Sequence, residues 1–451
     1  MTQGPIRKQL ISFALPLFAG SLIQLLYNTV DLMFVGRVLG TEASAAVGAS
    51  SLIVTCILGA FTGLSVGVGV VTAKAVGSGN IGRLNQIIHC AAGLTCVLSL
   101  VFTVLGLIMA PEFLRWIQTP ADVLENATAY LRLYLLSLIS IVSYNMGSGI
   151  LRALGNTKSP TLYQLAGGIA NIIGNTLFIC FLDWGVQGAA LATACSQGLA
   201  AFLIIRPLCT IKPPYRLRLR QLQINASICG QFLLVGIPAA IQSIVITLSN
   251  LIVQAHINQL GIDSMAAFTA YFKVENFIYL PIMAFGQACS TFTSQNIGAN
   301  QVDRAKQGVK TSLFLGITVT ISASVLTLCF SDFAFGLFSK EPAVIALGTK
   351  IAFVAYPFYF IYAFLEGYAS AIRGAGKALP AMLIVVINMC VVRTCILKVV
   401  LHFYPNALGV AAIYPLTWAC TGLCLFLYYK SGGWFSAQTD VARKRISVGQ
   451  R

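Results

Sequence analysis

Charged side chains are scarce in this chain of 451 residues. Only 9% are Asp, Glu, Lys or Arg, whereas 57% are hydrophobic, and an ordinary soluble domain carries about a quarter charged residues. A water-soluble fold of this composition would expose far more apolar surface than monomeric proteins tolerate. The composition therefore excludes an ordinary soluble domain and predicts that lipid surrounds most of the chain.

Histidine is also rare, and the cysteines follow no ligand spacing. The three His are scattered, and the thirteen Cys include no CxxC pair. A membrane-embedded enzyme needs a nucleophile and a base, or metal ligands, clustered at one depth. The sequence shows no such cluster, so we expect a protein that is not an enzyme and has no resident cofactor.

Long apolar runs are abundant. A closed barrel predicts segments of about ten residues with alternating polarity, whereas these runs reach about twenty residues, the length of a transmembrane helix. Backbone amides in hydrocarbon must be bonded within their own segment, so the runs are predicted to be helices. The twelve predicted spans cover residues 10–36, 45–76, 86–110, 126–151, 160–182, 187–206, 227–257, 265–297, 309–331, 343–372, 379–402 and 408–429.

The connecting segments carry an asymmetric charge. When the gaps between spans are numbered alternately, about 21 of the 29 Lys and Arg fall on one side, and most acids of the gaps fall on the other. The positive-inside rule places the cation-rich side, with both termini, in the cytoplasm. The net charge of +16 is then explained by topology and anionic lipid headgroups, and not by nucleic-acid binding.

The second half of the sequence repeats the first at an offset of about 221 residues. "LGTEASAAVGA" matches "LGIDSMAAFTA", "AVGSGNIGRLNQ" matches "NIGANQVDRAKQ", "LRALGNTKSP" matches "IRGAGKALP", and "GVQGAALA" matches "NALGVAAI". We therefore predict two six-helix lobes related by a pseudo-two-fold axis along the membrane normal, with a cavity between them. The predicted parts are an N-lobe (1–206), a basic cytoplasmic linker (207–224), a C-lobe (225–430) and a cytoplasmic tail (431–451).

Several motifs resemble the multidrug and toxic compound extrusion transporters, within the multidrug, oligosaccharidyl-lipid and polysaccharide flippase superfamily. They are Pro16, Asp31 and "VGRVLG" in the first span, and "QNIGANQVDRAKQG" after the eighth. The resemblance covers essentially the whole chain. It implies an all-α, V-shaped pair of six-helix bundles that exchanges Na+ or H+ for cationic, amphipathic drugs.

The resemblance also implies an ion site in the N-lobe. Family members with a well-described site use an Asp in span one, an Asn and an Asp four residues apart in span five, and a Thr in span six. Asp31, Asn171 and Thr193 match these places, and Asn175 stands where the second Asp is common. We predict an ion-coupling set of Asp31, Asn28, Asn171, Asn175 and Thr193, of which all but Asn28 are Na+ ligands if sodium drives transport.

Only three acids lie inside apolar runs: Asp31, Glu275 and Glu366. An ionised carboxylate at a helix centre costs about 2.5–3.5 kcal/mol on insertion scales, so each needs a partner, a water-filled cavity or a proton. Asp31 is the leading coupling residue; the alternative is a polar contact that fixes helix packing. Glu366 is either a counter-charge for substrate or a hydrated helix-end acid.

Two hypotheses are open for Glu275 as well: a transport role, or a structural ion pair with Lys273 or Arg393. A cation as deep in a span as Arg393 is expected to pair with an acid, and Tyr rings near an acid can hold a cationic or aromatic ligand. The predicted substrate and cavity residues are Glu366, Glu275, Tyr362, Tyr359, Tyr27 and Arg393.

These observations predict a monomeric secondary transporter of a bacterial inner membrane that expels small organic molecules by alternating access. A flippase for a lipid-linked saccharide is the nearest alternative, and it would need a strongly cationic cavity for a pyrophosphate. A channel would instead show uncoupled flux. The partners expected are a small-molecule substrate and the lipid bilayer.

Overall fold

The computed structural model describes residues 1–211 and 216–435 and, within these ranges, all side chains except those of residues 32, 33, 37, 41 and 42. The predicted tail therefore lies outside the described residues from residue 436 onward. The chain is 88% helical, with no strand in the described ranges, and it carries ten or more apolar helices of membrane length. The predicted all-α, polytopic membrane class is confirmed.

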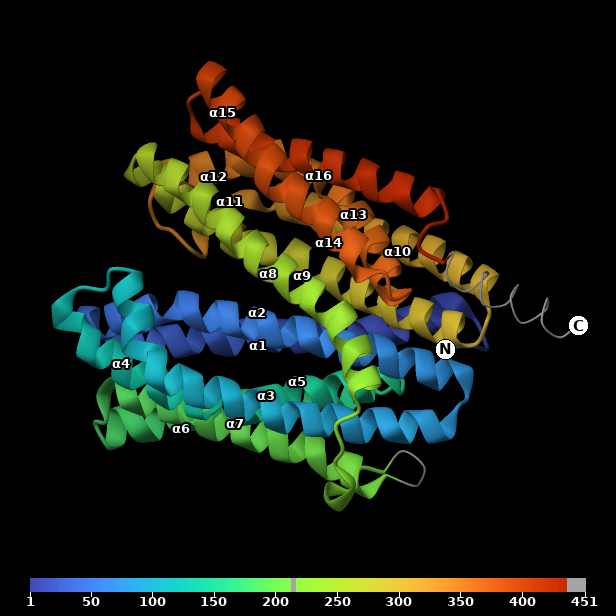
Figure 1. Cartoon of the computed structure of the whole chain (residues 1–451). Coiled ribbons are helices and arrows are strands. Elements are labelled where there is room, and N and C mark those ends of the chain that lie inside the picture. The colour runs from blue at the N-terminus through green and yellow to red at the C-terminus, as the bar shows by residue number, and fades with distance from the viewer. Residues whose placement is uncertain (212–215, 436–451) are drawn as a thin grey trace, which may run out of the picture. The chain divides into compact units, whose positions relative to one another are not determined.

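The first half of the chain forms seven α-helices, and a π-helix (η1) continues the sixth (Figure 1). Their bounds are α1 Ile6–Val38, α2 Gly40–Ser78, α3 Ile81–Trp116, α4 Ala121–Leu136, α5 Leu138–Ala153, α6 Lys158–Asn175, η1 Thr176–Phe181 and α7 Gly185–Thr210.

The second half forms nine α-helices, with two 3-10 turns and a second π-helix, η4. Their bounds are η2 Leu219–Gln221, α8 Ala226–Gln259, α9 Ile262–Gly298, α10 Val302–Cys329, α11 Ser331–Gly336, α12 Pro342–Ala355, η3 Tyr356–Phe358, α13 Tyr359–Gly374, α14 Ala378–Val386, η4 Ile387–Val392, α15 Arg393–Phe403 and α16 Ala407–Lys430.

In the part of the chain that the structure describes, ten helical stretches are long and apolar enough to cross a membrane, and α4 with α5 makes an eleventh if this pair, bent by 44°, is one span. The predicted eighth span is the helix α9, whose 37 residues include Asp263, Lys273 and Glu275. It is long enough to span, but none of its stretches is as apolar as those of the ten, which fits a helix that lines a polar site.

Contacts divide the chain into two compact units. We call residues Leu15–Ala240 the N-unit, and Met1–Ala14 with Ile241–Arg451 the C-unit. These bounds differ from the predicted lobes, because the start of α1 belongs to the C-unit and the first half of α8 belongs to the N-unit. Pro16 and Pro238 lie next to the two points where α1 and α8 change unit.

Specific contacts explain why α1 and α8 are each divided between the two units. In the C-unit, Arg304 donates to the carbonyl of Gly4 (2.7 Å), and the Arg7 guanidinium lies 5.9 Å from the centre of the Phe314 ring. In the N-unit, α2 approaches the first half of α8 closely at Gly63 and Gly67, where an added Cβ would overlap the backbone of α8.

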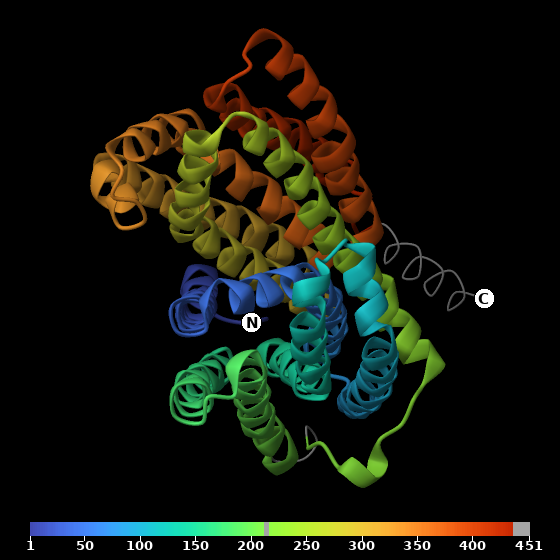
Figure 2. The same ribbon diagram turned by 90° about the vertical axis from the view of Figure 1, so that its left-hand side faces the viewer.

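Residues 216–224, the described part of the linker between α7 and α8, belong to the N-unit as well. Figure 2 shows this segment leading into α8. The backbone N–H of Arg218 donates to Nε2 of the buried His89 (3.0 Å), and Leu217 N–H donates to the carbonyl of Leu208 (2.8 Å). Further along, the Sγ atoms of Cys90 on α3 and Cys229 on α8 are 3.4 Å apart as free thiols. The predicted linker is therefore docked along α3.

Gly67→Ala is expected to destabilise the N-unit, because the new methyl group would overlap α8 at Phe232 and Gly236. Overpacking of this kind costs about 1–3 kcal/mol, measurable as a lower melting temperature of the purified protein in detergent. Gly48→Ala on the same helix is the control. An added Cβ there meets nothing within 4 Å, so alanine should leave stability unchanged or higher. Equal melting temperatures for the two variants would contradict the close approach.

Candidate functional site

The N-unit brings four of the predicted ion-coupling residues together in one hydrogen-bonded chain. Asn175 Nδ2 donates to Asp31 Oδ1 (2.6 Å) and to Asn171 Oδ1 (3.2 Å). Asn171 Nδ2 in turn donates to Thr193 Oγ1 (3.3 Å). This Asp31 network, made of Asp31, Asn171, Asn175 and Thr193, joins α1, α6 and α7.

Local helix geometry explains why these side chains meet. Asn171 and Asn175 are four residues apart on α6 and so share one face of that helix. Gly174 allows α7 to approach, since a Cβ there would lie 3.0 Å from the Cβ of Ala192. Directly after Asn175 the helix continues as the π-helix η1, and π-helical segments are frequent at functional sites.

No basic side chain neutralises the acid of this network. Within the described residues Asp31 forms no salt bridge, and its partner is a neutral amide. Asn171 and Asn175 are 1% and 0% exposed, whereas Asp31 is partly exposed. The Oδ1 atom of Asn175 is buried without a hydrogen-bond partner. Carboxylate, amide and hydroxyl oxygens of this kind suit a proton or a hard cation.

The structure does not bring Asn28 into the network. Its side chain is exposed and makes no hydrogen bond among the described residues. The neighbouring Tyr27 accepts a hydrogen bond from Gln164 Nε2 (3.4 Å) on α6. Tyr130 and Tyr134 of α4 also lie within electrostatic reach of Asp31. In the sequence, the spacing of four residues between Tyr130 and Tyr134 is typical of a shared helix face but does not indicate Asp31 as a neighbour.

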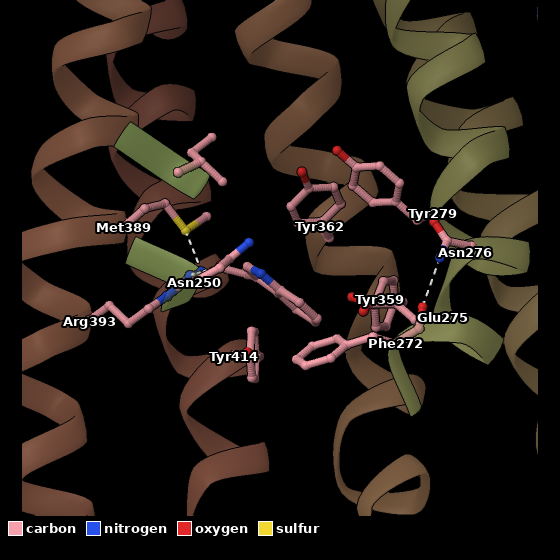
Figure 3. A pocket seen from close by; sticks show the side chains of 12 residues that line it. Asn250, Phe272, Glu275, Asn276, Tyr279, Tyr359, Tyr362, Met389, Arg393 and Tyr414 are labelled. Carbon is pink, nitrogen blue, oxygen red and sulfur yellow. Dashed lines mark hydrogen bonds between the residues drawn. The ribbon is translucent and has the colours of Figure 1, made fainter. Parts of the chain in front are cut away.

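The C-unit contains a pocket of about 320 Å³ between α8, α9, α13, η4, α15 and α16 (Figure 3). It brings together Glu275, Tyr359, Tyr362 and Arg393, four of the predicted cavity residues. Sequence reasoning missed the other lining residues, which come from the four helical segments α8, α9, η4 and α16: Ile246, Asn250, Phe272, Asn276, Tyr279, Met389, Tyr414 and Trp418. We call this the C-unit pocket.

The two charged groups of the C-unit pocket bind different partners. Glu275 accepts a hydrogen bond from the Tyr359 hydroxyl. Arg393 donates to Asn250 Oδ1 (3.0 Å) and contacts the Met389 sulfur (2.7 Å), and its guanidinium lies 5.2 Å from the centre of the Tyr414 ring. Among the described residues neither forms a salt bridge, so the expected ion pair of Arg393 with an acid is not found.

The second π-helix, η4, lies next to the C-unit pocket, as η1 lies next to the Asp31 network. η4 ends at Val392, directly before Arg393. A π-turn widens the helix and shifts the side chains that follow it relative to an α-helical register. Each half of the chain thus places a π-helix next to a polar residue that the sequence analysis singled out.

Glu366 lies outside the C-unit pocket, since it is absent from the lining residues. Its carboxylate is buried and accepts hydrogen bonds from Ser370 Oγ (2.7 Å) and from the Arg373 guanidinium on the same helix. Glu366 is therefore buried, in contrast to the hydrated acid that was one expectation, and it is paired with a fixed cation. Its predicted substrate role stays a prediction, for which this pairing offers no support.

A family model described as MatE matches the chain in two blocks, residues 16–177 and 238–397. The chain belongs to the MatE family. Its members are transporters rather than enzymes, which confirms that expectation. The two MatE blocks begin at Pro16 and Pro238, the prolines beside the points where α1 and α8 change unit. This correspondence supports the predicted duplication.

Relatives match this MatE chain over most of its length. The probable multidrug resistance protein YpnP of Bacillus subtilis (strain 168) is 28% identical over 445 residues, which are 96% of this chain and 97% of YpnP. The FAD transporter of Shewanella oneidensis is 27% identical over 353 residues, 76% of this chain and 77% of the transporter. The crystal structure of MATE in the straight conformation has a TM-score of 0.90 at 21% identity, and the match covers 97% of this chain and 98% of that one. This last likeness shows a shared fold.

Asn175→Ala is expected to destabilise the N-unit, because it removes the amide that donates to Asp31. Losing a hydrogen-bond partner of a partly buried carboxylate costs about 1–3 kcal/mol, measurable as a lower melting temperature in detergent. Asn28→Ala is the matched control, since this side chain is exposed and unbonded, and should change stability by less than about 0.5 kcal/mol. A larger loss for Asn28→Ala than for Asn175→Ala would refute the network.

Proposed function

We propose that this MatE protein is a secondary active exporter that exchanges H+ or Na+ for small organic compounds by alternating access. The family assignment supports membrane transport, and the relative YpnP, a probable multidrug resistance protein, supports multidrug efflux. The protein is, in this proposal, a monomer in a bacterial inner membrane. The charge asymmetry of the loops supports a cytoplasmic position for both termini.

The observation that carries the ion coupling is the acid without a fixed counter-charge. Asp31 lies in a membrane-length helix and is hydrogen-bonded to the neutral Asn175. An ionised carboxylate at such depth costs about 2.5–3.5 kcal/mol on insertion scales. A mobile cation that reaches Asp31 relieves this cost, and its release restores it. The free energy of the protein therefore differs between the ion-bound and the ion-free state of Asp31.

The Asp31 network can serve either ion. For Na+, the ligand oxygens are the Asp31 carboxylate, the two Asn carbonyls and the Thr193 hydroxyl. For H+, the proton binds Asp31 itself, and the neighbouring amides can hydrogen-bond both the charged and the neutral carboxyl. The buried, unpartnered Oδ1 of Asn175 is an acceptor in either case. The identity of the ion is left to the transport assay.

Exchange requires that the ion and the substrate favour different states of the protein. Pro16, near the start of α1, gives the Asp31 network a structural link to such a change. Thr161 Oγ1 on α6 donates to the carbonyl of Pro16 on α1 (2.7 Å), and α6 also carries Asn171 and Asn175. A change in the bend of α1 is thus transmitted to the helix that holds the partners of Asp31.

Asp31→Asn is expected to abolish uphill transport, because an amide neither binds a proton in this pH range nor supplies a negative ligand for Na+. The measurement is drug transport in proteoliposomes under imposed H+ or Na+ gradients, which also identifies the driving ion. Asp122→Asn is the control, an exposed acid of the same unit, and should transport like the native protein. Uphill transport by Asp31→Asn at the native rate would remove Asp31 from coupling.

Pro16→Ala is expected to slow turnover without removing ion binding. Proline lacks the amide donor of a regular helix and so permits a bend, which alanine would stiffen. We expect turnover to fall by about 2- to 10-fold, while half-saturation by the driving ion changes less than about twofold. Pro111→Ala in α3 is the control for replacing a helical proline. Unchanged turnover in Pro16→Ala would count against a bending role.

A further inference from the structure

The C-unit pocket contains a guanidinium whose hydrogen bonding is incomplete. Arg393 is 4% exposed, and its Nε atom is buried without a partner. A guanidinium has five N–H donors, and the Met389 thioether is only a weak acceptor. No carboxylate of the described residues lies within 4.0 Å of Arg393. The pocket therefore presents a buried cation with spare donors, suited to an anionic group.

The same pocket presents an acid at a separate position. In Figure 3, Arg393 and Glu275 lie on opposite sides of the pocket, with Tyr362 and Tyr414 between them. Glu275 is partly exposed, and Tyr359 is its hydrogen-bond donor. The charges of Glu275 and Arg393 act on each other but do not meet in a salt bridge. A ligand can therefore reach both without first breaking an ion pair.

Aromatic rings form the wall between the two charges. The Trp418 ring centre lies 4.6 Å from that of Tyr359 and 5.4 Å from that of Tyr362, and Tyr279 lies 5.6 Å from Tyr362. Such rings stack on planar ligands, and their faces attract an ammonium group. The volume of about 320 Å³ is at the lower end of the range for small-molecule sites, which suits a ligand of about two rings.

Charge balance decides which ligand fits best. When Glu275 and Arg393 are both ionised, the pair has no net charge, so a purely cationic or purely anionic ligand would leave one uncompensated charge in a low-dielectric site, which is costly. A ligand with one charge of each sign adds no net charge. It can also form a bidentate contact with the guanidinium.

We propose that the C-unit pocket binds the transported substrate and that this substrate is an aromatic ampholyte. Arg393 holds its carboxylate, Glu275 receives its ammonium group, and the Tyr and Trp rings stack on its planar core. This proposal rests on the export function proposed above and narrows its substrate class. The sequence predicted a cationic substrate, because acids are among the predicted cavity residues. The proposed substrate instead carries a charge of each sign.

The test uses three matched probes and the full-length protein in lipid nanodiscs. The ampholyte is 4′-(aminomethyl)biphenyl-4-carboxylate, its methyl ester is the cation, and 4′-methylbiphenyl-4-carboxylate is the anion. Isothermal titration calorimetry should give an affinity for the ampholyte at least about tenfold above that of either other probe, since each lost charge-assisted hydrogen bond is worth about a factor of ten or more. Equal affinities for the ampholyte and the ester would overturn the proposal.

Two variants assign the charges. Arg393→Gln should remove the preference for the ampholyte over the ester, because the cationic ester then neutralises Glu275 and binds more tightly, whereas Glu275→Gln should remove the preference over the anion. Lys398→Gln on α15 and Asp263→Asn on α9 alter exposed charges on the same helices, and they should keep both preferences. Arg393→Lys retains the positive charge but lacks the planar guanidinium. This variant should keep part of the preference for the ampholyte over the ester, which shows that a substitution at this position leaves the protein folded. A preference that survives Arg393→Gln contradicts the assignment.

Transport assays separate this proposal from the function on which it rests. If the native protein exports an organic cation under an ion gradient but does not prefer the ampholyte, only the substrate class is wrong. If the ampholyte binds with the predicted preference but no compound moves under any gradient, the pocket assignment stands and the export function fails.

Discussion

The free-energy cost of an unpaired charge in a low-dielectric environment governs both polar sites of this protein. A buried charge is stable only when hydrogen bonds and an opposite charge compensate for lost hydration. Within the described residues, Asp31 has the amide of Asn175 but no fixed cation, and Arg393 has Asn250 but no fixed anion. Glu366 shows the contrasting case, since Arg373 on the same helix is its fixed cation and Ser370 donates a further hydrogen bond. Incomplete compensation distinguishes a site that awaits a mobile ligand from one that only stabilises a fold.

The backbone around these two sites follows the internal duplication. Each half has a proline-containing helix that changes unit, α1 at Pro16 and α8 at Pro238, and each has a π-helix beside a polar side chain. The side chains themselves have diverged. The N-unit site is made of oxygen ligands around one acid, whereas the C-unit pocket combines an acid, a guanidinium and aromatic rings. The two halves thus offer two similar scaffolds, one of which we propose for an ion and the other for an organic molecule.

Much of the fold follows from the sequence, because membrane helices must be long, apolar and internally hydrogen-bonded. The helical class was predictable on this ground. The family and the Asp31 network were predictable on another, the motifs that carry the family resemblance. The unit boundaries were not predictable, because they depend on close backbone approaches such as that of Gly67 to α8. Composition marks only the linker at 207–224 and says nothing of such contacts.

Side-chain partners across helices were the least predictable feature. Arg393 was expected to find an acid, yet its partners Asn250 and Met389 carry no charge, and no periodicity identifies them. Asn28 is one turn from Asp31 in the sequence but stays outside the network, while Asn175 reaches it from α6. Pairing of this kind is set by how neighbouring helices are rotated against each other, which a hydropathy pattern leaves undetermined.

The central claim is that a mobile cation neutralises Asp31, and infrared difference spectroscopy tests it most directly. Spectra of the membrane-reconstituted protein, recorded while Na+ is added at constant pH and while pH is changed without Na+, report the carboxylate vibrations. The account predicts a change in an aspartate band with one of the two ions, and the loss of that change in Asp31→Asn. A spectrum in which neither ion alters an aspartate band, or in which the change persists in Asp31→Asn, would contradict it.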